Sequence, residues 1–194
     1  MAQYKHIFGP VPSRRFGRSL GVDLVSLKTC TFNCIFCEVG ETDKLTIERK
    51  EYVPIREAIA EVDDWIRKDG NADFVTLAGS GEPTLNTGFG EVLDFLRGKG
   101  SFRTAILTNG SLLYLPEVRE SAMKADVVKV SLSGSNRGML ERINRLHPGL
   151  DFERMLEGMR KFRSSYNREL WLEVILVDGL NDNDEIVSEI ASLA

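Results

Sequence analysis

Two hydrophobic periods alternate along the chain. Apolar runs of strand length recur five times, and between them apolar residues repeat every three or four positions, as on one face of a helix. The runs that predict strands are Leu20–Leu27, Asp73–Gly79, Phe102–Asn109, Asp126–Ser133 and Leu170–Val177. The helical periods predict helices from Pro54, across Phe89–Leu96, over Pro116–Met123, around Phe152–Met159 and from near Asp182.

This alternation predicts an α/β fold with parallel strands, because a helix carries the chain back to start each next strand. The strand runs are almost continuously apolar, which is typical of strands covered on both faces. Five β-α units follow one another without a linker or low-complexity segment, so residues 1–194 are interpreted as one domain. The periodicity leaves open whether the sheet stays flat or curls toward a barrel.

Composition narrows the class of protein. Hydrophobic residues make up 42% and charged residues 28%, as in ordinary globular domains, and no apolar run is long enough to span a bilayer. We therefore expect a cytoplasmic protein without a membrane partner. The net charge of -4 argues against a general polyanion binder, but Arg14, Arg15 and Arg18 make the N-terminal segment basic. They could bind an anionic substrate or simply lie solvated on the surface.

Each polar motif follows a predicted strand. Since the carboxyl ends of parallel strands meet at one edge of a sheet, we expect the motifs to form one site there. The motifs are Cys30–Cys37, Gly79–Asn86, Thr108–Gly110, Ser131–Ser135 and Asp178–Asp182.

The first motif holds every cysteine of the chain, spaced C-x3-C-x2-C at Cys30, Cys34 and Cys37. Three thiols packed so closely argue against a disulfide framework and favour metal or redox chemistry. A [4Fe–4S] cluster normally takes four thiolates, so three would leave one iron free to bind another ligand. A zinc ion held with His6 or His147 is the alternative.

This spacing after a first strand, followed by the later motifs in order, resembles the radical S-adenosylmethionine (SAM) superfamily. The resemblance implies a partial (β/α) barrel of five or six β-α units and a [4Fe–4S] cluster on Cys30, Cys34 and Cys37. It also implies that SAM chelates the open iron and is cleaved reductively to a 5′-deoxyadenosyl radical, which abstracts hydrogen from a substrate. A flavodoxin- or ferredoxin-like one-electron reductant would then be a partner.

The resemblance also assigns SAM contacts. Phe36 would lie near the adenine, and the glycine-rich segment near the amino group, where glycine lets backbone approach closely. The residues assigned in this way are Phe36, Gly79, Ser80, Gly81, Glu82, Asn109, Ser131 and Ser133. Tight turns and small buried residues are the competing interpretation of these positions. No acid–base pair is predicted. Glu173 lies inside an apolar strand, so its charge requires a partner.

A narrower resemblance is to the subgroup named after wyosine-type tRNA synthases, carried by Gly9–Asp23, Ile143–Glu153 and Leu170–Asp182. It leaves the substrate open, with a nucleotide or tRNA as the candidate. Three departures stand beside it: Ser133 replaces a usual Asp, the sixth β-α unit is missing, and no cysteines remain for a second cluster, so wyosine chemistry itself is not expected. The alternative functions are a degenerate or truncated Fe–S protein that binds a cluster or transfers electrons without turnover, and a zinc-bound α/β module that binds nucleic acid.

Overall fold

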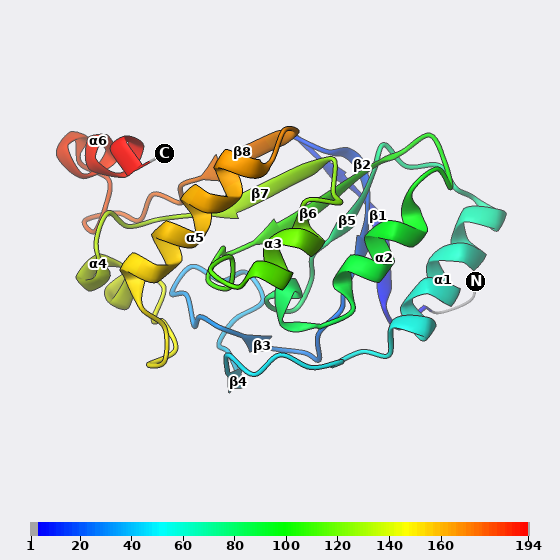
Figure 1. Ribbon diagram of the computed structural model, residues 1–194, viewed down its shortest axis with the longest axis horizontal. Coiled ribbons are helices and arrows are strands. Elements are labelled where there is room, and N and C mark those ends of the chain that lie inside the picture. Colours follow the sequence, from blue (N-terminus) through cyan, green and yellow to red (C-terminus); the bar gives the residue numbers. More distant parts are fainter. Residues whose placement is uncertain (1–3, 194) are drawn as a thin grey trace.

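A six-stranded sheet forms the centre of the computed structural model, which describes residues 4–193. The spatial order is β1-β2-β5-β6-β7-β8; β2 to β8 run parallel, and β1 pairs antiparallel with β2 (Figure 1). The sheet is open, because β1 and β8 are both edge strands. Its strands are β1 (Ile7–Ser13), β2 (Gly17–Val22), β5 (Phe74–Leu77), β6 (Arg103–Thr108), β7 (Val127–Ser131) and β8 (Glu169–Glu173).

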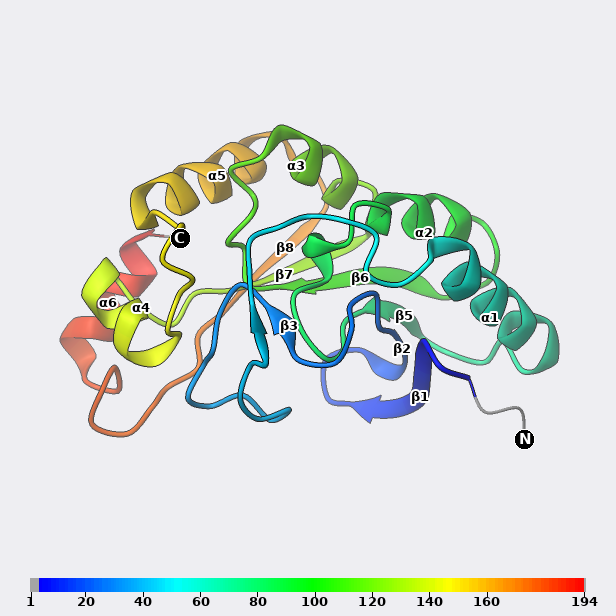
Figure 2. The ribbon, with the colours of Figure 1, turned by 90° about the horizontal axis from the view of Figure 1, so that it is seen from below.

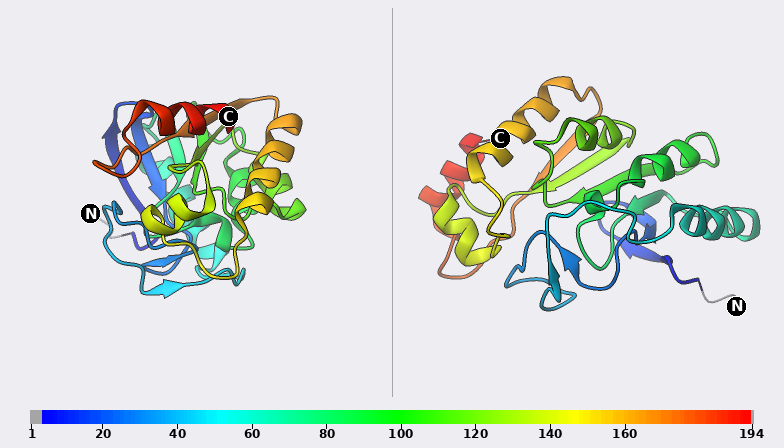
Figure 3. Two further views of the ribbon diagram at one scale, coloured as in Figure 1. Left: turned by 90° about the vertical axis from the view of Figure 1, so that its left-hand side faces the viewer. Right: turned by 60° about the horizontal axis from the view of Figure 1, so that its bottom comes forward.

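Four of the helices cover one face of this sheet. Figure 2 shows α1, α2, α3 and α5 in an arc along that side. The helices α4 and α6 lie side by side away from that arc (Figure 3), joined by a 2.6 Å hydrogen bond from Ser135 Oγ to Glu189. The helices are α1 (Ile55–Lys68), α2 (Phe89–Leu96), α3 (Pro116–Ala122), α4 (Arg137–Ile143), α5 (Phe152–Ser165) and α6 (Asp184–Leu193), with a 3₁₀ turn η1 at Pro83–Leu85.

The main core lies between the sheet and these helices. Alternate strand residues such as Val75, Ile106 and Val128 are fully buried against helical residues such as Val62 and Phe89. The period of two in a strand and of 3.6 in a helix explains which side chains meet. The predicted parallel α/β architecture is confirmed.

A smaller apolar cluster covers the opposite face of the sheet. Phe16, in the turn between β1 and β2, stacks on Trp171 with ring centroids 5.1 Å apart and meets Phe74 edge-on at 5.0 Å. Ala105 and Val127 complete the buried part of this cluster. The N-terminal hairpin therefore shields the second face, which explains why the strand sequences are apolar throughout.

Several elements differ from the sequence expectations. The first parallel strand ends at Val22 rather than Leu27, because Asp23 accepts a hydrogen bond from the Ser80 backbone N–H at 2.9 Å and the chain leaves the sheet there. The strand β1 was not predicted because prolines weaken its strand signal, although they are tolerated at an edge. The short pair β3 (Thr29–Cys30) and β4 (Lys44–Leu45) was also not predicted; it lies below the main sheet in Figure 1.

Membrane spanning receives no support from the helices. None of those described between residues 4 and 193 is both long and apolar enough to cross a bilayer.

Candidate functional site

The cysteines lie in and just after β3, on the loop that leads to β4. The end of α4 supports this loop through backbone hydrogen bonds: Asn33 N–H donates to Asn144 O at 3.0 Å, and Ile35 N–H donates to Ile143 O at 3.0 Å. His147 N–H donates to Thr31 O at 2.9 Å. A segment more than a hundred residues later in the chain thus holds the cysteine loop in place.

A pocket of about 180 Å³ brings most of the predicted site residues together. It lies at the carboxyl ends of the parallel strands, as the motif positions predict. Its lining includes Cys30, Cys34, Cys37, Phe36, Gly79, Ser80, Gly81, Glu82, Asn109 and Ser131, together with Lys28, Lys129 and Asn144.

Ser133 lies outside this pocket. It is only 1% exposed, its hydroxyl accepts a hydrogen bond from Ile175 N–H at 3.1 Å, and its carbonyl accepts one from Asn181 Nδ2 at 2.7 Å. Both contacts join the end of β7 to the segment after β8. The Asp178–Asp182 motif is likewise part of that connection and does not line the pocket, so four of the five polar motifs meet at the site.

The glycine-rich loop after β5 packs tightly against the start of the cysteine loop. Gly79 has φ +153°, and a Cβ on it would overlap the carboxylate of Asp23. A Cβ on Gly81 would overlap the carbonyl oxygen of Thr29. Only glycine fits these two positions, which explains their place in the motif.

Glu82 organises the inner wall of the pocket. It is 2% exposed; one carboxylate oxygen accepts from Thr84 N–H at 3.1 Å and Thr108 Oγ1 at 2.7 Å, and the other accepts from Asn109 N–H at 2.8 Å. Burial raises the pKa of the Glu82 carboxyl above its usual range, although these hydrogen bonds oppose that rise. The carboxylate therefore positions the loop that carries Asn109.

Each cysteine thiol has one nitrogen donor nearby, and the three donors come from different parts of the chain. The pairs are Asn109 Nδ2 with Cys30 Sγ at 3.7 Å, Asn144 Nδ2 with Cys34 Sγ at 3.2 Å, and Lys28 Nζ with Cys37 Sγ at 3.9 Å. Burial raises the pKa of Cys30 to about 12 and that of Cys34 to about 11. Metal binding would have to displace these protons.

The two metal sites considered for these thiols, a cluster and a single zinc ion, need different arrangements of ligands. Within residues 4–193, no three His, Cys, Asp or Glu side chains gather closely enough to ligate one metal ion, whereas the thiolates of a cluster each bind a different iron. His6 lies 3.4 Å from Glu57 on α1, and His147 Nδ1 accepts from Gly149 N–H at 3.0 Å. Neither histidine lines the cysteine pocket, so the geometry does not support the zinc alternative.

Lys129 is a pocket residue that sequence reasoning missed. It forms an ion pair with Glu173, which also pairs with Arg15 and lies 3.4 Å from Ser131 Oγ. Burial alone would raise the pKa of Glu173, but the two cations outweigh it and hold that pKa below its usual range. Glu173 thus has the partner that its apolar strand required. The sequence signal that could have identified Lys129 is its charge inside the otherwise apolar run of β7.

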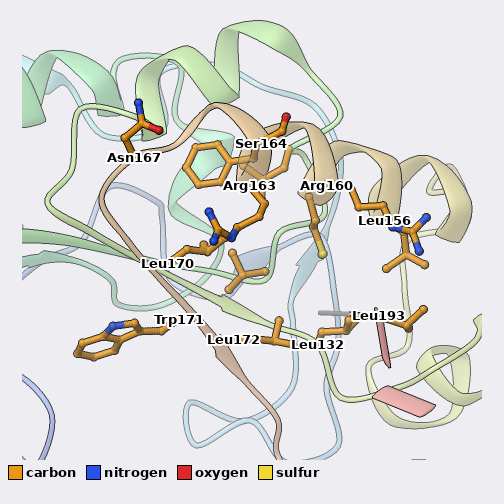
Figure 4. A pocket seen from close by; sticks show the side chains of 14 residues that line it. Leu132, Leu156, Arg160, Arg163, Ser164, Asn167, Leu170, Trp171, Leu172 and Leu193 are labelled. Carbon is orange, nitrogen blue, oxygen red and sulfur yellow. The ribbon is translucent and has the colours of Figure 1, made fainter. Parts of the chain in front are cut away.

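A larger cavity, of about 570 Å³, lies elsewhere, between α5 and the strands β7 and β8 (Figure 4). Leucines such as Leu132, Leu156 and Leu172 line it, together with Arg160 and Arg163. No cysteine and no predicted site residue lines this cavity. The larger cavity therefore has none of the side chains that give the cysteine pocket its chemistry.

Comparison with curated proteins finds relatives that match most of the chain. It is 35% identical over 180 residues to UPF0026 protein slr1464 of Synechocystis sp., covering 92% of this chain and 67% of the relative. It is 34% identical over 186 residues to UPF0026 protein MJ1312 of Methanocaldococcus jannaschii, covering 95% of this chain and 58% of the relative. A probable dual-specificity RNA methyltransferase RlmN of Parasynechococcus marenigrum is 28% identical over 84% of this chain and 48% of the relative. The chain thus spans about half to two thirds of these proteins.

Among solved structures, TYW1 with a lysine-pyruvate adduct bound has the same fold. The TM-score is 0.69 at 18% identity, over 92% of this chain and 62% of that structure. The family model described as "Radical SAM superfamily" matches residues 24–190, a range that contains the three cysteines and the glycine-rich loop. With that match and the partial-barrel fold, the chain belongs to the radical SAM superfamily.

Proposed function

We propose that the protein binds a [4Fe–4S] cluster through Cys30, Cys34 and Cys37 and cleaves SAM reductively. The observation that carries this proposal is the pocket that joins the three thiols to the glycine-rich loop and the ends of β6 and β7. When bound, the cluster and SAM would supply the radical that removes a hydrogen atom from the substrate.

The side chains and backbone of the pocket would bind and orient SAM. The loop of Gly79 and Gly81, held by their close packing against Asp23 and Thr29, would present its backbone to the methionine part, while Asn109 and Ser131 present polar groups at strand ends. Phe36 offers an aromatic face to the adenine. Lys129 adds a cation suited to the SAM carboxylate, which the sequence interpretation did not include. Ser133 is retained only as a positioning residue, because its hydroxyl already holds Ile175.

For the substrate we propose a nucleotide or RNA. Arg14 and Arg18 are exposed on the N-terminal hairpin, and the matching relative from Parasynechococcus is named an RNA methyltransferase. Arg15 is connected to the pocket through Glu173 and Lys129. A flavodoxin- or ferredoxin-like protein would supply the single electron. Substrate and reductant are proposals for the whole protein, since the chain spans only part of its relatives.

The test is anaerobic reconstitution with iron and sulfide, followed by dithionite and SAM and an assay for 5′-deoxyadenosine. We expect 5′-deoxyadenosine from the unchanged protein and none from Cys34→Ala. Ser164→Ala, on the exposed side of α5, is a control of similar size change and should behave as the unchanged protein.

Two results would contradict the proposal. If the reconstituted protein shows no iron–sulfur absorption, the protein does not bind the proposed cluster. A full cluster without SAM cleavage would favour the alternative of a binding or electron-transfer protein. If cleavage occurs, phosphorylated nucleosides and tRNA are the first substrates to screen.

A further inference from the structure

The donors around the thiols suggest how this chain would adjust the cluster. The nitrogen that approaches Cys37 Sγ belongs to the ammonium group of Lys28, whereas Cys30 and Cys34 each face a neutral amide. Reducing a cluster adds negative charge, so positive charge and N–H donors near its sulfurs favour the reduced state. A charged donor has a larger effect than a neutral one.

Lys28 is an unusual cation. It is 6% exposed, its ammonium donates to the backbone carbonyl of Gly40, and within residues 4–193 no carboxylate forms an ion pair with it. An ammonium has three donors, and a buried charge without a counter-charge is costly. The thiolates of a bound cluster would supply the missing negative charge.

The backbone fixes Lys28 in this place. Its N–H donates to Ser80 O at 3.2 Å, and its carbonyl accepts from Lys44 N–H at 3.0 Å, so the glycine-rich loop and β4 hold it from both sides. Its φ of +60° is uncommon for a residue with a side chain. Backbone strain of this kind persists where the surrounding structure determines it, and it is frequent at functional sites.

Asn144 gives a second, independent observation. It is 3% exposed, and its Nδ2 lies 3.2 Å from Cys34 Sγ. Its Oδ1 is buried and has no hydrogen-bond partner within the described residues. Buried polar groups are rarely left unpaired. The surrounding packing therefore holds the amide so that Nδ2 faces the sulfur, although Oδ1 then has no hydrogen-bond donor.

We propose that Lys28, assisted by Asn144, raises the reduction potential of the cluster by placing a buried cation and an N–H donor against two of its thiolates. Both act through the cluster ligands, so both are positioning residues and not catalytic ones. The inference rests on the proposed cluster, but it does not depend on SAM cleavage.

The test measures the midpoint potential of the reconstituted cluster. Electron paramagnetic resonance monitors the reduced cluster during a redox titration without SAM. We expect Lys28→Met to shift the equilibrium at least tenfold toward the oxidised cluster, about 59 mV more negative. Lys28→Arg keeps the charge and should stay near the unchanged protein. Lys44→Met, which removes an exposed lysine of the neighbouring strand β4, is the matched control and should not shift the potential.

Asn144→Ala should move the potential in the same direction by a smaller amount. Lys28→Gln keeps an N–H donor for the Gly40 carbonyl but removes the charge. It replaces Lys28→Met in the test if that variant binds little of the cluster. A full cluster with an unchanged potential in the Lys28 variants would overturn the inference. So would an unchanged potential with weaker SAM binding, which would make Lys28 a SAM ligand.

Two further outcomes separate this inference from the proposed function. If neither uncharged Lys28 variant loads a cluster and Lys28→Arg does, the charge acts in assembly, contrary to the inference. If the unchanged protein itself binds no cluster, the proposed function fails together with the inference. An unchanged potential in variants with full clusters would leave the proposed function intact.

Discussion

At the scale of single residues, the closest packing of the site is where Gly81 crosses Thr29. The glycine-rich loop and the cysteine strand touch there through backbone, since a side chain on Gly81 would overlap the Thr29 carbonyl oxygen. The Glu82 N–H donates to that same carbonyl at 3.2 Å. The glycine therefore determines how closely the glycine-rich loop approaches the first cysteine.

Gly81→Ala should destabilise the protein by about 3 kcal/mol, because rigid backbone and not a flexible side chain would have to move. Gly138→Ala is the control: a Cβ there meets only Asn136 Oδ1 at 3.5 Å on α4, so it should stabilise by about 0.5–1 kcal/mol. Urea unfolding measures both changes. Equal stability of the two variants would show that the loop adapts to the side chain.

At the scale of elements, Glu173 connects three of them. Its carboxylate on β8 pairs with Lys129 on β7 and with Arg15 in the turn between β1 and β2, close to the stacked rings of Phe16 and Trp171. Charged and aromatic contacts together hold the N-terminal hairpin against the far edge strand. They join the turn of the N-terminal hairpin to the last strand of an otherwise open sheet.

Glu173→Gln should lower the free energy of unfolding by about 1–3 kcal/mol at neutral pH. The folded pKa of Glu173 is lowered, so its stabilisation is complete above the ordinary carboxyl pKa of about 4.3 and is lost as pH falls through the folded value. The difference between the two proteins should therefore shrink as the medium is acidified below that pH.

Urea unfolding between neutral pH and pH 3 measures this difference. Glu153→Gln, an exposed carboxylate in the first turn of α5, is the control and should follow the unchanged protein. If the unfolding free energies of Glu173→Gln and of the unchanged protein differed by the same amount at all pH values, the charge interaction of Glu173 with Lys129 and Arg15 would be contradicted.

At the scale of the whole molecule, the site is assembled from distant parts of the chain. The cysteine loop has little secondary structure of its own, and it is held by the glycine-rich loop on one side and by the end of α4 on the other. The helices α1 and α2 pack at the β1–β2 side of the sheet, away from this assembly (Figure 1). A ligand that joins the thiols should therefore stabilise one part of the molecule more than the other.

We expect a reconstituted cluster to slow hydrogen exchange about tenfold or more in residues 28–46 and 143–147, and to leave α1 unchanged. Removing the iron with a chelator should restore fast exchange there and lower the melting temperature. Cys34→Ala, treated in the same way, should show neither effect. Uniform protection across α1 as well would indicate a global change instead.

The strand order shows what local pattern can and cannot predict. The five parallel strands were predicted in the right order because long apolar runs dominate their signal, although the first was predicted at Leu20–Leu27 and lies at Gly17–Val22. The edge strand β1 was missed because it contains prolines, and α4 was missed because it lacks the initial proline that marks the equally short α3. Their stability comes from partners, namely β2 for the first and the cysteine loop for the second.

The sequence by itself determined the class of fold, the three thiols and the glycine-rich loop, because these depend on residue type and spacing along the chain. Only the tertiary structure decided that Ser133 lies outside the pocket, that Lys129 faces into it, and that Lys28 and Asn144 reach the thiols. The contacts of Ser133 and Asn144 join residues far apart in sequence, and no local periodicity records any of these contacts. They exist because packing brings the carboxyl ends of the strands and the end of α4 to one place.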